Sequence, residues 1–247
     1  MNKLIAVGLL LPSAYLTLAQ TPSKTKVSAS VAYHSYRFYE AAPAYGLEKV
    51  RRLITNGKKE DQFEEELEPP LTTGQFGALS LEEKFTYVMI HPEEFNQACY
   101  IAPVVVGEEH LIFGRLPGPG AGLRQWSAGQ RAFLKESKPE LIELLKKEIG
   151  GHEHVGLNVK TAVADIDAYP LIPSIVAAAN RNKKDLDLLT VLSILMKDGR
   201  YRPFENTDIY RKLYGPKSND SVGVPDSVTT RNFIINQARA FYETLKG

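Results

Sequence analysis

Cysteine, tryptophan and an excess of charge of either sign are scarce in this chain of 247 residues. It has one cysteine, one tryptophan, and 30 Lys and Arg residues against 29 Asp and Glu residues. A single cysteine excludes an internal disulfide framework and a cysteine-rich zinc module. Balanced charge argues against a protein that coats DNA or binds membranes through a polybasic surface, because both need surplus cations to displace counterions. We therefore expect no nucleic acid among its partners.

Apolar runs long enough for several membrane spans are also missing, but one shorter run stands at the N-terminus. Lys3 precedes an apolar stretch over residues 4–11, and small residues follow up to Ala19. This three-part pattern is typical of a secretory signal peptide. The stretch over residues 4–19 contains Pro12 and is shorter than the roughly 20 residues that cross a bilayer. We predict a signal peptide over residues 1–19, cleavage near Ala19, and a periplasmic or extracellular protein without a stable membrane anchor.

The remaining chain reads as one domain preceded by a short polar segment. Residues 20–30 are rich in Ser, Thr and Lys, which predicts a flexible leader, and residues 31–247 form a single helical domain. Three helix starts carry the capping-box pattern, in which a Ser hydroxyl and a Glu or Gln side chain satisfy free backbone donors. They are Ser80 with Glu83, Ser127 with Gln130, and Ser137 with Glu140.

Short connections between the helices predicted over residues 138–198 indicate antiparallel neighbours. The sequence therefore predicts a mainly α fold of irregular stacked α-hairpins, with a solenoid-like arrangement as the sharper hypothesis. The expected helix starts are unevenly spaced, whereas a solenoid has a fixed repeat. A loop-rich segment spans residues 100–126. In it, residues 104–106 and 110–113 form either a short hairpin or an ordered loop.

The clearest candidate metal ligands are His152 and His154, followed by Asp165 and Asp167. Imidazole nitrogen and carboxylate oxygen are ligands of zinc and manganese. Two acids that are two positions apart on a helix point about 200° apart, so both cannot face one ion. The competing interpretation is an exposed polar loop beside ordinary surface acids.

A thiol enzyme is the second candidate, with Cys99 as nucleophile and His91 or His110 as base. The competing interpretation is a buried structural cysteine, because free cysteine is among the most buried residue types. The chain has no Gly-x-Ser-x-Gly elbow, no Walker loop and no dinucleotide fingerprint. We expect no cofactor.

Two groups of residues suggest recognition of a partner. Tyr33 and Tyr36 belong to an aromatic-rich segment, and Arg200, Tyr201 and Arg202 follow a predicted helix. Tyrosine and arginine are enriched at interface hot spots. The alternative places the tyrosines in the core and the arginines at a solvated helix end.

These observations do not specify the function, and they favour an exported helical protein that binds or scaffolds a protein or an extracellular polymer over an enzyme. The alternative is an exported hydrolase, metal-assisted through His152 and His154.

Overall fold

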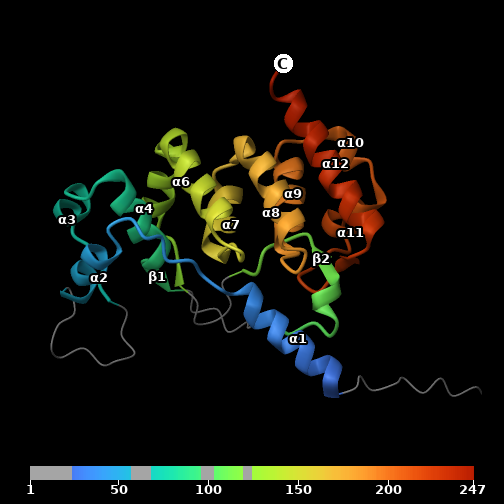
Figure 1. The fold of residues 1–247 in the computed structure, drawn as a ribbon, viewed down its shortest axis with the longest axis horizontal. Coiled ribbons are helices and arrows are strands. Elements are labelled where there is room, and N and C mark those ends of the chain that lie inside the picture. Colours follow the sequence, from blue (N-terminus) through green and yellow to red (C-terminus); the bar gives the residue numbers. More distant parts are fainter. Residues whose placement is uncertain (1–23, 57–67, 96–102, 119–123) are drawn as a thin grey trace, which may run out of the picture.

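A computed structural model describes residues 24–56, 68–95, 103–118 and 124–247 (Figure 1). The predicted signal peptide and Cys99 lie outside these residues, so the predictions made for them remain untested. Among the described residues, no helix is both long enough and apolar enough to cross a membrane.

The fold is mainly helical, as the sequence predicted. The described residues form twelve α-helices: α1 (Lys24–Arg37), α2 (Leu47–Asn56), α3 (Thr73–Gly77), α4 (Leu81–Ile90), α5 (Ala128–Glu136), α6 (Lys138–Gly151), α7 (Leu157–Asp165), α8 (Ile172–Arg181), α9 (Asp187–Asp198), α10 (Arg202–Glu205), α11 (Asp208–Tyr214) and α12 (Val228–Thr244). Short 3-10 helices are η1 (Glu108–His110) and η2 (Tyr169–Leu171), and short strands are β1 (Glu94–Phe95), β2 (Leu111–Phe113), β3 (Arg124–Gln125) and β4 (Gly223–Pro225).

Helix α9 lies at the centre of the helical body and packs against α7, α8 and α12. Leu189, Leu192 and Leu195 on this helix are fully buried. A helix that is apolar around its whole circumference is typically enclosed by its neighbours. Because several helices surround α9, the body differs from a solenoid, in which each repeat contacts only the next. The solenoid-like arrangement is therefore not confirmed.

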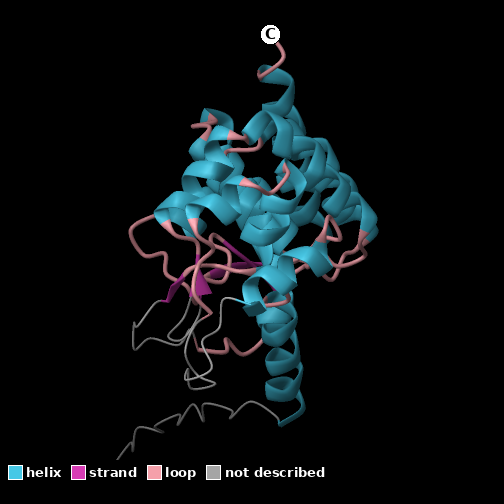
Figure 2. Ribbon diagram, turned by 90° about the vertical axis from the view of Figure 1, so that its left-hand side faces the viewer, coloured by secondary structure: helices cyan, strands magenta, loops and turns pink. Residues whose placement is uncertain are grey.

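Two short antiparallel ladders lie below the helical body, on the same side as α1 (Figure 2). Strand β2 pairs with β4, and β1 pairs with β3. The local hairpin considered for residues 104–106 and 110–113 is wrong, because Leu111–Phe113 pairs with Gly223–Pro225 instead. The Thr190 hydroxyl of α9 donates to the Phe113 carbonyl at 2.9 Å, which fastens β2 to the core. Strand β2 therefore pairs with β4, which is distant in the sequence, and not with the neighbouring residues 104–106.

Helix α1 extends away from the helical body (Figures 1 and 2). It begins at Lys24, so residues 24–30 are helical although the sequence predicted a flexible leader there. After α1 the chain crosses to α2, and Asn158 of α7 holds this crossing. Its side-chain oxygen accepts from the Ala41 amide at 3.0 Å and its nitrogen donates to the Ala41 carbonyl at 2.8 Å.

Two of the three predicted capping boxes form in the structure. Ser80 and Ser127 both form the complete capping box. Ser137 precedes α6 as predicted, but its side chain makes no capping hydrogen bond. Pro139 lies in the first turn of α6, where its missing N–H costs nothing.

Candidate functional site

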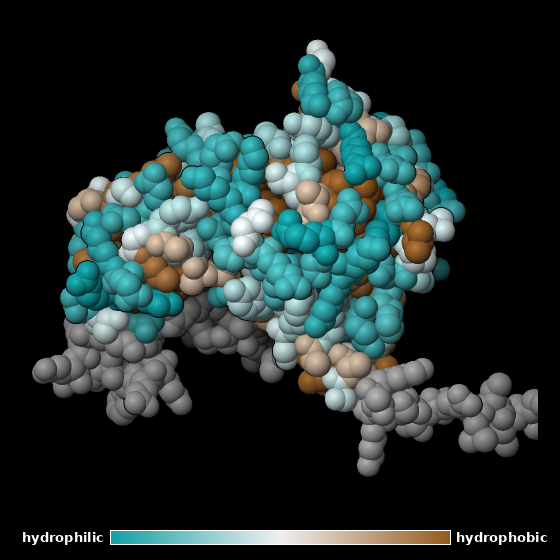
Figure 3. Space-filling view, in the orientation of Figure 1, coloured by the Kyte–Doolittle hydropathy of each residue, from teal (hydrophilic) through white to brown (hydrophobic). Residues whose placement is uncertain are grey.

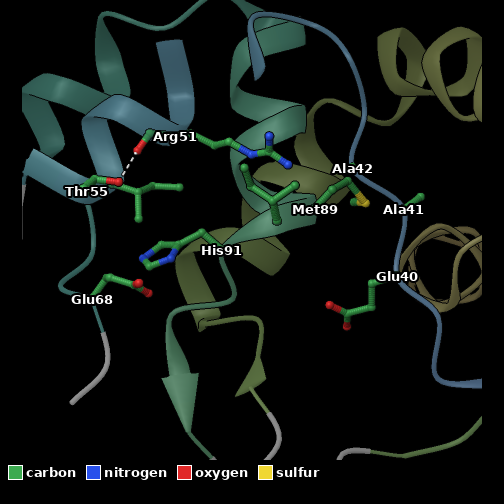
Figure 4. A pocket seen from close by; sticks show the side chains of 10 residues that line it. Glu40, Ala41, Ala42, Arg51, Thr55, Glu68, Met89 and His91 are labelled. Carbon is green, nitrogen blue, oxygen red and sulfur yellow. Dashed lines mark hydrogen bonds between the residues drawn. The ribbon is translucent and has the colours of Figure 1, made fainter. Parts of the chain in front are cut away.

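An open hollow of about 420 Å³ lies between the 40–42 crossing, α2 and the end of α4 (Figure 4). Its volume falls in the range of small-molecule pockets. Figure 4 shows the Arg51 side chain above the hollow and the carboxylates of Glu40 and Glu68 on opposite sides of it. The hollow therefore presents groups of both charges to a ligand.

Helix α2 places Arg51 by burying its other face. Val50 and Ile54 are buried, and α2 packs against α4. Arg51 directly follows Val50, and Thr55 directly follows Ile54. Both residues line the hollow, one helical turn apart. The Thr55 hydroxyl donates to the Arg51 carbonyl at 3.0 Å. Arg51 Nη1 lies 3.4 Å from Glu48 in an exposed pair, a contact too weak to fix the guanidinium.

His91 lies at the bottom of the hollow, directly after α4. Its amide donates to the Tyr87 carbonyl at 2.9 Å, and its carbonyl accepts from Gln130 Nε2 at 2.8 Å. The imidazole packs against the Tyr87 ring, with 5.2 Å between the ring centroids. These contacts fix a buried imidazole in the hollow that Arg51, Glu40 and Glu68 also line.

The hollow offers binding groups more readily than catalytic ones. Among its described lining residues there is no Ser or Cys, and the Thr55 hydroxyl already donates to the backbone. Nucleophilic catalysis requires a nucleophile within hydrogen-bond reach of a base. The chemistry present suits recognition of a charged polar group.

A second polar region joins α1 to η1 and to the start of α9, and we call it the α1 junction. Arg37 donates to Asp187 through Nε at 3.1 Å and Nη2 at 2.9 Å, and its Nη1 lies 3.6 Å from Glu108. All three side chains are buried. Burial alone lowers the pKa of the Arg37 guanidinium, but attraction by Asp187 outweighs it and raises the pKa above its usual value. Arg37 is therefore a permanent buried cation at this junction.

Another contact of α1, with the loop between α6 and α7, brings together two residues that the sequence assigned to different sites. Tyr36 of the binding hypothesis stacks on His154 of the metal hypothesis, with ring centroids 3.6 Å apart. The Tyr36 hydroxyl accepts from Asn182 Nδ2 at 2.9 Å. Burial, and then the charges of Lys160 and Lys184, lower the pKa of His154 to about 4. The imidazole is thus neutral at physiological pH.

Tyr33 belongs to the core, which is the alternative that the sequence left open. Its side chain is 4% exposed, and its hydroxyl accepts from the Leu186 amide at 3.2 Å. A tyrosine with a buried ring and a hydrogen-bonded hydroxyl stabilises the fold and offers little contact to a partner.

The proposed metal ligands diverge in the structure. His152 is exposed and lies 3.3 Å from Glu148, while His154 packs on Tyr36. Arg131 holds Asp165 at 3.0 Å. No group of three or more His, Cys, Asp or Glu side chains in the described part of the chain is placed to hold a metal ion. A metal at His152 and His154 stays a prediction without a third ligand among those residues.

Arg200, Tyr201 and Arg202 follow the opposite end of α9 from the α1 junction. A helix of 12 residues is about 18 Å long, so the two predicted recognition patches are separate. Arg202 pairs with Glu205 at 3.4 Å, and the Tyr201 ring packs on Phe241 with centroids 5.2 Å apart. Packing on the body therefore occupies part of this second patch.

Sequence reasoning missed the residues that define both polar regions. Arg51 and His91 meet only because α2 packs on α4, and Arg37 and Asp187 are 150 positions apart. No spacing rule connects such residues. The one available signal was the isolated Arg37 within an aromatic-rich helix.

His91 and His110, the proposed bases for Cys99, lie in different surroundings. His91 is buried at the hollow, and His110 is 81% exposed beside Glu109. Cys99 lies outside the described residues, so its position relative to either histidine is not described. Comparison of the whole chain with known proteins gives no further indication, because no family model, no curated protein and no solved structure matches it.

Proposed function

We propose that the protein is an exported binding protein whose 420 Å³ hollow receives a charged end or side group of a protein or an extracellular polymer. The proposal rests on the size and the charged lining of the hollow. It combines a volume suited to a small polar group with the Arg51 cation, and the Glu40 and Glu68 carboxylates face it from both sides (Figure 4). A partner group bearing both charges complements these side chains, because each charge meets a group of the opposite sign.

The test compares two neighbouring arginines on α2. Arg51 lines the hollow, whereas Arg52 is exposed and donates to the Glu48 carbonyl at 3.3 Å. A panel of short peptides and oligosaccharides of defined charge is titrated against the full chain by calorimetry. We expect Arg51→Ala to weaken binding about tenfold or more, the scale of a lost charged hydrogen bond. Arg52→Ala leaves binding unchanged. Equal losses in both variants, or no saturable binding across the panel, contradict the proposal.

Export is supported by the N-terminal pattern of Lys3, the apolar stretch over residues 4–11 and Ala19. Its test is the mass of the protein made with its own N-terminus and recovered from outside the cytoplasm. We expect a chain that begins at Gln20. An intact chain that retains Met1 in the cytosol contradicts export.

One observation favours the alternative, a metal-assisted exported hydrolase. His154 Nε2 is buried and has no hydrogen-bond partner among the described residues. An unpartnered imidazole nitrogen is what a metal ion takes as a ligand. Metal analysis of native protein separates the two functions: stoichiometric zinc or manganese that disappears in His154→Ala supports the hydrolase.

A further inference from the structure

A second cavity, of about 160 Å³, lies between α1, η1, β2 and the segment that follows β2. It is separate from the hollow described above, which is built on α2 and α4. Its apolar lining includes Phe38, Phe113, Val105 and Leu116, and an exposed ion pair between Arg115 and Asp220, 3.5 Å apart, lines it as well. The Arg37 guanidinium lies over the Phe113 ring at 4.5 Å from the centroid. This packing fixes one wall of the cavity.

The volume limits what the cavity can hold. An engineered protein cavity of about 150 Å³ lined by apolar side chains binds benzene. The cavity under α1 is of the same size, so it accommodates one six-membered ring and few further atoms.

One polar pair in the lining offers the ligand a hydrogen-bonding group. His34 lines the cavity, and its Nδ1 lies 3.0 and 3.2 Å from the two oxygens of Glu108, which is 1% exposed. A carboxylate accepts hydrogen bonds, so Nδ1 donates to Glu108, and the tautomer that does so has Nε2 as an acceptor. Nε2 has no hydrogen-bond partner within the described ranges. The pair therefore offers one acceptor of defined tautomer beside apolar walls.

The surface next to the cavity is also apolar. Val27 and Val31 lie one turn apart on α1, and Val104 and Val106 belong to the loop that leads into η1; each is 37–47% exposed. Figure 3 shows apolar side chains gathered beside the outer end of α1. Exposed apolar surface that continues toward a cavity marks an approach for an apolar ligand.

We propose that this cavity binds a compact aromatic ring bearing one hydroxyl group, a ligand of the phenol class. The ring lies between Phe38 and Phe113, and its hydroxyl donates to His34 Nε2. This binding is independent of the hollow, so either site can fail its test while the other stands.

Three single-ring probes test the proposal: phenol, anisole and benzoate. Each is titrated into the full chain, and binding is followed by NMR. We expect saturable binding of phenol about fivefold or more tighter than anisole, which lacks the donor, as expected for one hydrogen bond. Equal binding of phenol and anisole contradicts the hydrogen bond. Tighter binding of benzoate identifies an anion site instead, and absence of saturable binding contradicts the cavity as a site.

Variants locate the binding. His34→Leu abolishes the preference for phenol over anisole, whereas His34→Gln retains part of it because the amide both donates to Glu108 and accepts from the ligand. Leu116→Trp fills the cavity and removes binding of every probe. His110→Leu, an exposed histidine on η1 outside the cavity, is the matched control and leaves binding unchanged. If His34→Leu fails to fold, His34→Gln and Leu116→Trp still decide the outcome, and binding unaffected by Leu116→Trp overturns the proposal.

Discussion

The α1 junction and the core around α9 are held by opposite kinds of interaction. At the junction, Arg37 forms a buried fork with Asp187, and Glu108 accepts from His34. Around α9, side chains such as Leu189 and Leu192 are fully buried among apolar neighbours. Buried ion pairs contribute little net stability when intact, because desolvation offsets their attraction, yet breaking one is strongly destabilising. The core thus supplies stability, and the junction specifies where α1 lies.

The largest expected effect comes from breaking the junction at Asp187. Asp187→Ala leaves Arg37 buried without its fork, and we expect a loss of about 3–5 kcal/mol in the free energy of unfolding. Asp198→Ala, at the other end of α9 and half-exposed beside Lys197, is the matched control and costs less than about 1 kcal/mol. Urea titration measures both. Equal small losses would show that the fork is not the determinant of this junction.

The core variant Leu192→Ala removes a fully buried side chain. We expect a cost of about 2–5 kcal/mol from lost burial and the cavity left behind. Because Leu192 belongs to the cooperative core, all helices lose hydrogen-exchange protection together, whereas Asp187→Ala exposes α1 selectively. Val228→Ala, at a position 77% exposed, is the control within about 0.5 kcal/mol of the parent. If Leu192→Ala lowered the hydrogen-exchange protection of α1 alone, the two regions would not differ in this respect.

The third prediction concerns the pH dependence of stability at the contact between His154 and α1. The folded pKa of His154 is about 4, below the usual value of 6.5, because of burial and the charges of Lys160 and Lys184. Between these values the unfolded chain binds more protons, so stability falls as the pH drops from 6.5 toward 4 and is fully present above 6.5. Asp187 opposes the shift in part. His154→Phe keeps a ring stacked on Tyr36 and removes the titration, so thermal unfolding of this variant loses that part of the acid sensitivity. An unchanged pH profile contradicts the assignment.

The smallest effect compares two serines of α1. The Ser30 hydroxyl donates to Glu109 at 2.8 Å and accepts from the Gly107 amide at 2.8 Å, which ties α1 to η1. Ser35 is exposed and donates only to the Val31 carbonyl within the helix. We expect Ser30→Ala to cost about 1 kcal/mol and Ser35→Ala close to nothing, measured by chemical denaturation. A larger loss at Ser35 contradicts the picture of the junction.

Local signals in the sequence predicted local structure. Ser80 and Ser127 begin helices because each capping box closes within four residues, and the helical class follows from the same patterns. Asp185 shows where such signals fail. Aspartate is a favoured N-cap residue, but α9 begins at Asp187 with Leu186 as its N-cap, and the Asp185 carboxylate accepts from Lys160 at 2.7 Å. A partner distant in the chain outweighs the local role.

The hollow and the α1 junction depend almost wholly on such distant partners. Arg51 and His91 of the hollow, and Arg37 and Asp187 of the junction, carry no mutual spacing in the sequence. Tyr36 and His154 were both noticed, but as parts of different hypotheses, and only the fold stacks their rings. Residue type indicated candidate residues, but only the packing of the fold determines which of them are in contact.

The 150 positions between Arg37 and Asp187 also set an order of events during synthesis. At 5–20 residues per second, Asp187 emerges roughly 8 to 30 s after Arg37. Through that interval α1 lacks its Asp187 anchor, and its 14 residues are a length at which an isolated helix is marginal in water. The fork that fixes the end of α1 can therefore form only after most of the polypeptide has been made.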